Sequence, residues 1–480
     1  TLDSSGAVTI KAQSDLGSTA LAGGVAAGNN VGVGIASAVI VSSGTVLAEL
    51  EPNAEVLNAT SFSDTAEASQ DIKVVGVSAA AGDDAGIAGV ASVISSTNSV
   101  QALLGLDSSV NTSGDVTLTA GNTFTSFVLA GGAAGGGDAG IGAAASVVTV
   151  NNTTRAALAD GTSSTDAVSI DAGGALTISA TASETGTTLT AAGAAAGEVA
   201  VGAGAAVYVL GTTTEALVGK YAQIGHTDQP TSLALSASDT TDLTTIAGAI
   251  AGGGTAGVGA GAAVGSVVKA ITAQIGDDAD VQVGDLNMQA QGSETALTTA
   301  VGVGIGGTAG LAGAISVYSV SDTTTAEVGA ATVVSQGNAA VLAGDNVSID
   351  FISGAAGLSG TAAVGAAASV ALVDNITHAT IDDDASVTAL AKGGNVTYVT
   401  GYTPSLGGSA GDYAANTPSD YATDTTNNTD GEVLTADEAQ RQGLRMLALT
   451  RSDSPVTATG QGVIVAANGD TSVRSLAVGA

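Results

Sequence analysis

The chain contains no cysteine, no tryptophan, four phenylalanines and seven tyrosines among its 480 residues. The absence of cysteine excludes disulfides and thiolate metal sites, and it is compatible with export from bacteria. The shortage of aromatic residues excludes a conventional core of Phe, Leu and Trp. Because 45% of the residues are hydrophobic and 69 are glycine, the chain is too apolar to be disordered. We expect a thin core in which Gly and Ala let backbones approach closely and Val and Ile fill the rest.

Basic residues are also scarce: ten Lys and Arg stand against 44 Asp and Glu, for a formal net charge of −34. Phosphate contacts need a basic surface, so we expect no nucleic-acid partner and no affinity for anionic membranes. The negative charge keeps a long Ala-rich body soluble and offers carboxylates to calcium. The uncharged stretch 246–268 is rich in Gly, Ala and Thr rather than Leu and Phe, so no transmembrane segment is expected.

Motifs of enzymes are missing as well. His226 and His378 are the two histidines, and neither lies in a nucleophile motif or beside a cysteine that could complete a zinc site. Lys220, His226 and Asp228 form the one cluster of catalytic residue types before residue 400, and a solvated turn explains it better. No Gly-x-Gly string is followed by the Gly-Lys-Ser/Thr of a phosphate loop. We predict that the protein is not an enzyme; a polysaccharide-active β-helix is the enzyme alternative.

A Gly/Ala-rich run with an apolar centre and a β-branched tail recurs seven times, once in about every 55 residues. The central residues, called anchors below, are Val33, Ile87, Ile141, Val201, Val258, Leu311 and Val364. A near-constant period of this size is typical of a solenoid, in which each unit packs only against its neighbours. We expect the anchors to lie inside, in one column, so that Ile141→Asp would cost several kcal/mol.

Alternating apolar and Thr/Ser residues end 23 positions before most anchors, as in Val116-Thr117-Leu118 and Leu176-Thr177-Ile178. This alternation indicates β-strands, and the many glycines would destabilise a helix in the Ala-rich runs. We predict strands of about 5–6 residues and no helix longer than about two turns in residues 1–400. About three coils would then fit in each ~55-residue unit, and seven units would make a rod about 100 Å long.

Acidic residues recur 18 to 20 positions after the anchors, at Glu51, Asp107 and Asp160 and in two clusters. The clusters contain Asp277, Asp278 and Asp280, and Asp382, Asp383 and Asp384. Solvated turns explain them, because Asp is a common turn residue. The alternative is local calcium binding by these six aspartates. If each unit makes three coils, the acids of successive units lie ~14 Å apart. Salt screens the repulsion between exposed charges at that distance, so a counterion would not be needed to hold the stack together.

The repeat stops after Val399 and resumes at Val463-Ile464-Val465, which matches the strand that ends 23 positions before an anchor. The next anchor would be position 488, so we interpret the chain as a segment of a longer protein. We divide it into a solenoid (1–400), a polar insertion (401–456) and the start of another unit (457–480). Within the insertion, Thr435 to Glu438 form a capping box for a helix to about Leu449. The stretch 424–438 resembles a calcium loop, but its spacing fails the EF-hand rule.

The block at 116–156, with V-T-L-T-A, L-A-G-G-A-A-G, A-G-I-G-A-A-A-S-V and N-N-T-T-x-A in order, resembles the repeats of giant bacterial surface adhesins. These are the filamentous-haemagglutinin-like and leukotoxin-like filamentous adhesins, and the resemblance covers about 1–400 and 457–480. It implies an all-β, right-handed parallel β-helix, export to the cell surface, and a role in adhesion, biofilm or cell contact. It carries over no functional residues.

From these observations we predict an extracellular structural and adhesive rod. Its partners would be copies of itself, neighbouring surface filaments, or cell-surface and matrix glycans. The alternative from a different class is a self-assembling fibre or sheath, in which identical chains stack end to end.

Overall fold

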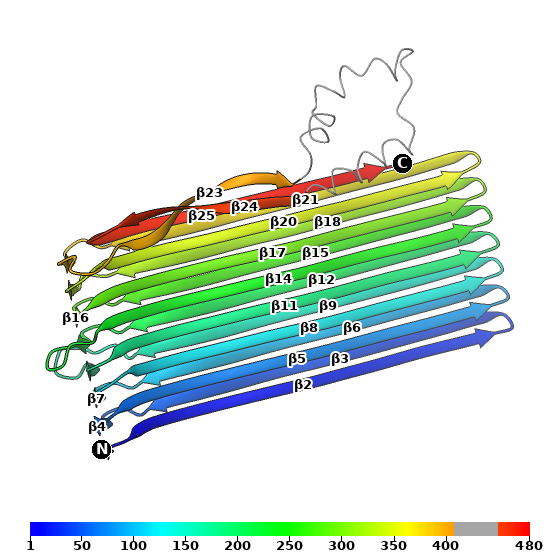
Figure 1. Cartoon of the computed structure of the whole chain (residues 1–480). Helices are drawn as coiled ribbons and strands as arrows, with labels where there is room; N and C mark the ends of the chain where they lie inside the picture. The colour runs from blue at the N-terminus through cyan, green and yellow to red at the C-terminus, as the bar shows by residue number, and fades with distance from the viewer. Residues whose placement is uncertain (408–449) are drawn as a thin grey trace, which may run out of the picture.

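The chain forms a parallel β-solenoid in a computed structural model that describes residues 1–407 and 450–480 (Figure 1). The secondary structure of these residues consists of strands and turns, with no helix among them. Each coil contains one short strand and two long strands, and each strand pairs with its counterpart one coil away. The prediction of an all-β parallel β-helix is confirmed.

Three parallel sheets run along the solenoid. Sheet A contains the short strands β1 (Leu2–Asp3), β4 (Glu55–Ala59), β7 (Ser109–Thr112), β10 (Ser169–Ala172), β13 (Gln223–Ile224), β16 (Asp280–Val283), β19 (Thr332–Ser335) and β22 (Ser386–Ala389). Sheet B contains β2 (Ala7–Gly28), β5 (Ser61–Gly82), β8 (Val116–Gly136), β11 (Ala175–Ala196), β14 (Ser232–Gly253), β17 (Asp285–Gly306), β20 (Ala339–Ser359) and β25 (Val463–Gly479). Sheet C contains β3 (Val31–Leu50), β6 (Ala85–Leu104), β9 (Ala139–Leu158), β12 (Val199–Val218), β15 (Ala256–Ile275), β18 (Ala309–Val328) and β21 (Ala362–Ile381).

The register read from the repeat is the register of the structure. Ile141 pairs with Ile87 on one side and with Val201 on the other, and the ladder of anchors continues through sheet C from Val33 to Val364. The resumed repeat also pairs as expected, because Val465 lies beside Val341 in sheet B. Both ladders are uninterrupted parallel pairings, so equivalent residues of successive units lie one strand spacing apart.

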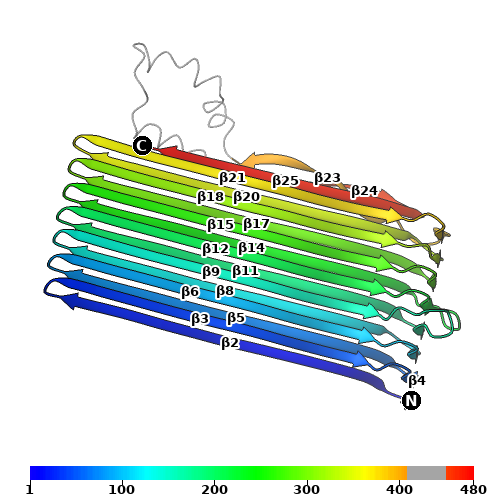
Figure 2. The same cartoon turned by 180° about the vertical axis from the view of Figure 1, so that it is seen from behind.

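The predicted strand length and the predicted number of coils per unit are wrong. The strands of sheets B and C are long, from 17 residues in β25 to 22 residues in β2, and one repeat unit makes one coil rather than three. The Gly/Ala-rich runs continue the strands instead of ending them, and two-residue turns such as 29–30 and 83–84 join the long strands of sheets B and C. Eight coils at ~4.8 Å span about 35 Å, whereas a 22-residue strand is about 70 Å long. The body is therefore a slab that is wider than it is long, as both views show (Figures 1 and 2).

The anchors lie on the outer face, which contradicts the prediction that they lie inside. Ile141 is 42% exposed and Val364 is 56% exposed. Their neighbours in the strand point inward and are glycine or alanine because sheets B and C approach closely there. A Cβ added to Gly142 would clash with the carbonyl oxygen of Gly193, and one added to Gly202 would lie 2.9 Å from the carbonyl oxygen of Ile250. A bulky apolar residue can therefore stand only on the outside.

The interior changes in composition along the strands. Next to sheet A lies a core of larger apolar side chains such as Phe62, Leu118 and Met288. A second apolar core, with Tyr208 and Phe351, lies farther along the long strands. Polar and charged side chains occupy the space between these cores, at positions such as Asp239 and Lys269. At the far turns only small clusters of alanine, with glycine, separate the two sheets. We call this far part the thin half.

After β22 the chain leaves the solenoid and returns as β25. The described ends of this excursion are two antiparallel strands, β23 (Val396–Gly407) and β24 (Thr450–Gly460), so the predicted boundaries at 400 and 456 fall within a hairpin. Gly407 pairs with Thr450 at its far end. The predicted helix at 435–449 and the calcium-loop-like stretch 424–438 lie outside the described residues.

Because the anchors lie on the outer face and the neighbouring glycines on the inner face, substitutions at the two kinds of position should change stability differently. Ile141→Asp places a charge on the outer face of sheet C, outside the packed interior, and should lower the free energy of unfolding by about 1 kcal/mol or less. Gly142→Val forces a side chain between the two backbones and should cost more than about 3 kcal/mol. Urea unfolding followed by circular dichroism compares the two variants. If Ile141→Asp is the more destabilising, the assignment of the inner and outer faces is wrong.

Candidate functional site

The acidic edge lies in the turns between sheet C and sheet A. Asp107, Asp278 and Asp384 have positive φ angles of 57°, 57° and 68°. Asp and Asn tolerate this left-handed conformation better than most residues, so the turn itself favours them. The solvated-turn interpretation therefore has a backbone reason at these three positions.

Several turn carboxylates also join successive coils. Asp160 accepts a hydrogen bond of 2.9 Å from the backbone N–H of Lys220, and Asp277 accepts one of 3.2 Å from the backbone N–H of Ala330. Asp285 does the same with Asn338 at 2.7 Å. Successive turns lie one coil apart, so the expected three-coil separation between acids of adjacent units is wrong. A carboxylate in one turn is close enough to bond the backbone of the next.

The six aspartates predicted to bind calcium lie in or directly beside two separate turns. Asp277, Asp278 and Asp280 follow the fifth coil, and Asp382, Asp383 and Asp384 lie in the equivalent turn two coils later, with the acid-free turn 329–331 between them. Within residues 1–407 and 450–480, no three Asp, Glu or His side chains are grouped so as to hold a metal ion. Calcium binding by these residues stays a prediction.

Basic partners already occupy part of the first cluster. Lys220 Nζ lies 2.6 Å from Asp277 Oδ2, and this hydrogen bond lowers the pKa of Asp277 below its ordinary value. His226 Nε2 lies 3.4 Å from Asp280 Oδ2. His226 and Asp280, together with Tyr221, Asp278 and Asp384, line an open recess of about 450 Å³.

The structure does not assemble the candidate catalytic cluster of Lys220, His226 and Asp228. Lys220 and His226 are bound to Asp277 and Asp280, and the backbone N–H of Asp228 donates to Asp171. His378 lies in β21, far along the chain from these residues.

A column of buried polar residues, which the sequence analysis did not identify, passes between sheets B and C. Its charged members in the fourth to seventh coils are Glu184, Asp239, Lys269, Glu294, Asp322 and Asp345. All six are at most 1% exposed. Asn98, Asn122 and Asn152 extend the column through the second and third coils, where Asn98 donates to Asn122 and Asn152 donates to Glu184.

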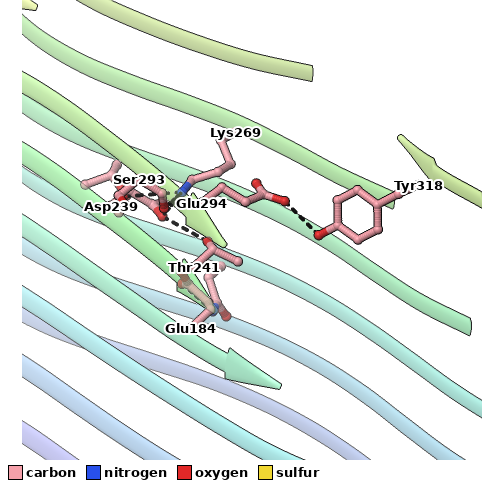
Figure 3. Close-up of polar contacts among 9 residues, drawn as sticks. Glu184, Asp239, Thr241, Lys269, Ser293, Glu294 and Tyr318 are labelled. Carbon is pink, nitrogen blue, oxygen red and sulfur yellow. Dashed lines mark hydrogen bonds and ion pairs between the residues drawn. The ribbon is translucent and has the colours of Figure 1, made fainter. Parts of the chain in front are cut away.

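Lys269 is the centre of this column (Figure 3). Its Nζ lies 2.8 Å from Asp239 Oδ1, 3.3 Å from the Asp239 carbonyl oxygen and 3.1 Å from the Ser293 carbonyl oxygen. The three donors of the ammonium group therefore each have an acceptor. Thr214 donates to the other oxygen of Asp239 at 3.1 Å, so this buried ion pair is also hydrogen-bonded.

The remaining carboxyl groups outnumber the cation. Burial raises the pKa of Asp322 to about 9 and that of Glu294 to about 7, despite the opposing effect of Lys269. Burial also raises the pKa of Glu184 well above its ordinary value. Tyr318 donates to Glu294 at 2.7 Å, whereas neither oxygen of Asp322 has a hydrogen-bond partner among the described residues. Burial therefore favours the protonated form of these carboxyl groups, and the sheets on both sides shield the column from solvent.

Strand periodicity carries the signal for this column. Counting in steps of two from the buried Ile178 and Met288 reaches Glu184 and Glu294, which places both carboxylates inside. Strands of the predicted length, about 5–6 residues, would end before Glu184 and Glu294, so the alternation was not followed that far.

No protein-family model, curated protein or solved structure matches the chain. In the part of the chain that the structure describes, no helix is long and apolar enough to cross a membrane.

The raised carboxyl pKa values predict that stability falls as pH rises. Below about pH 4 the groups are protonated in both the folded and the unfolded state, so their contribution is fully present; it is lost as pH rises through the folded-state pKa values of about 7 and about 9. Asp322→Asn should therefore be more stable than the parent at pH 8, by a few kcal/mol, and nearly equal to it at pH 4.

Asp383→Asn is the matched control, because it makes the same side-chain change in an exposed turn. It should stabilise the protein by less than about 1 kcal/mol at either pH. Urea titrations of the parent and both variants at the two pH values give the unfolding free energies to be compared. Equal effects of the two variants at pH 8 would show that the net charge, and not the buried column, sets the pH dependence.

Proposed function

We propose that this chain is an extracellular structural and adhesive body, a segment of a large repetitive bacterial surface protein that mediates adhesion, biofilm formation or cell contact. The observation that carries the proposal is the uninterrupted register of the coils. Each coil pairs with the next through the same columns, so coils can be added without changing the packing. Such a body extends and displays, and its length is set by the number of coils.

The distribution of chemistry supports the same proposal. The titratable groups with the largest pKa shifts are buried between the sheets and serve packing. The length of the repeat unit varies at the sheet A end, where the loops 159–168 and 225–231 are longer than the corresponding turns of the other coils. In solenoids, variable loops on one edge are typical of a binding face.

Within this proposal, the excursion between β22 and β25 displays the partner-binding element. Its partner would be a neighbouring filament or a cell-surface or matrix glycan. Calcium bound at the acidic edge, by Asp277, Asp278 and Asp280 or by Asp382, Asp383 and Asp384, is part of the proposal.

The described hairpin offers a clean deletion to test this element. Because Gly407 and Thr450 are paired, residues 408–449 can be replaced by Asn-Gly, which closes two-residue hairpins. We expect the variant to keep its β circular dichroism and its unfolding transition, since closing a loop of different length changes the free energy of folding little. Beads coated with it should bind cells and matrix glycans more weakly than beads coated with the parent.

The triple variant Asp382→Asn, Asp383→Asn and Asp384→Asn is the comparison. If it loses binding and a chelator has the same effect on the parent, the acidic edge is the binding element and not the insertion. Full binding by both variants would contradict both assignments.

A self-assembling fibre is the second candidate function, and the same uninterrupted register of the coils favours it. Strands β2 and β3 end sheets B and C on one side, and within the described residues nothing pairs with their outer edges. Val25 is 88% exposed and Ile35 is 72% exposed on these edge strands. Unpaired edges are templates for another chain.

End-to-end stacking predicts open-ended filaments in electron micrographs, and these should be shortened by Val25→Lys with Ile35→Lys. The control is Ala79→Lys with Gly89→Lys, which changes the same two columns one coil inside the edge. Filaments affected equally by both pairs, or no filaments from the parent, would contradict stacking through these edges.

A further inference from the structure

The outer face of sheet C carries an apolar trough. Its floor is formed by residues 143–145, 203–205, 260–262, 313–315 and 366–368, with a volume of about 670 Å³. The outward residues of this floor are alanine or glycine, apart from Ile315. The anchors form a rib along one side. A second rib, which is valine in every coil from Val39 to Val370, forms the other side.

This face lacks charge in a highly charged protein. In each of the seven repeats, the segment from two positions before the anchor to eight positions after it contains no Asp, Glu, Lys or Arg. With 11% charged residues overall, about eight would be expected in these segments together. Their outward positions are well exposed, as at Val33 (50%) and Leu311 (44%). Packing of the interior does not exclude charged residues from these outward positions. The absence of charged residues there therefore points to contact with another surface.

The size of the face fits a protein interface. Eleven residues along the strand and seven strands across give about 1,000 Å². The largest apolar patch of an ordinary monomer is about 300–600 Å². A stable complex buries about 800 Å² per partner, so this face is large enough on its own.

We propose that the occupant of this face is a second copy of the chain, packed sheet C against sheet C about a twofold axis parallel to the solenoid axis. The two ribs are six residues apart, about 20 Å, and two outward floor positions separate them. In the twofold arrangement the valine rib of each copy lies in the trough of the other. The contact is isologous and closed. It does not depend on the adhesive function or on end-to-end stacking.

The charge distribution favours a protein copy over a lipid surface. Acidic residues such as Asp83, Asp84, Asp138 and Glu198 lie in the turns beside the face and make a polar rim. Because both copies are strongly negative, added salt should tighten the dimer by screening their repulsion.

Sedimentation velocity on the full chain over a range of concentrations tests the proposal. The parent should be a dimer, and Ala203→Arg with Ala260→Arg should weaken the dimer about tenfold or more, because both arginines enter the trough. These residues point outward, so the variant should keep the β circular dichroism of the parent. The arginines also reduce the net negative charge of each chain. A loss of association therefore cannot be caused by stronger repulsion between the net charges of the two copies.

Thr213→Arg with Thr272→Arg is the matched control, since it changes outward residues of the same strands, β12 and β15, beyond the trough. It should remain a dimer. The absence of native cysteine allows a second measurement. A mixture of Val207→Cys and Ala203→Cys chains should form disulfide-linked heterodimers on mild oxidation, whereas Thr213→Cys with Ala203→Cys should not.

Three results would overturn the proposal: a monomeric parent at all concentrations, a dimer that the trough arginines leave intact, or cross-linking that is equal for Val207→Cys and Thr213→Cys. Flotation of a monomeric parent with phosphatidylcholine vesicles, lost in the trough variant, would assign the face to lipid instead.

Discussion

The close approach of sheets B and C in the thin half is the constraint on which the rest of the structure depends. Inward positions there accept only glycine, alanine or another small residue, with Val90 as an exception. The long strands can therefore continue without an aromatic core, which the composition could not supply. Burial of Gly and Ala contributes little hydrophobic free energy per residue, so backbone pairing and the apolar cores nearer sheet A hold the coils together.

The same constraint accounts for the outer surface. Bulky β-branched residues favour strands, but the inner face of the thin half cannot hold them, and they occupy the outer face instead. The resulting apolar ribs lie in a protein whose charges gather in the turns and at the sheet A half. A solenoid that displays partners at one edge and pairs laterally through one face would use different surfaces for the two tasks.

The buried column shows how the wider part of the slab tolerates charge. Lys269 is fully hydrogen-bonded, while burial raises the pKa of Asp322, whose two carboxyl oxygens have no hydrogen-bond partner among the described residues. Replacing such a group by an apolar one often stabilises a protein, so the column is not explained by stability alone. Polar side chains in the column contact others on the facing sheet or in the next coil, so a shift in strand register would break these hydrogen bonds.

The sequence by itself determined the all-β class, the one-unit register from Val33 to Val364 and the return of the repeat at Val463, because a constant spacing fixes which residues are neighbours. It did not determine which side of the strand faces inward at Ile141. A period of two is the same for either face, and hydrophobicity alone favours the wrong one. The sheet-to-sheet distance, a property of the tertiary structure, decided it. The same distance, with strands that continue through the glycines, decided that a unit is one wide coil and that Glu184 and Lys269 are buried.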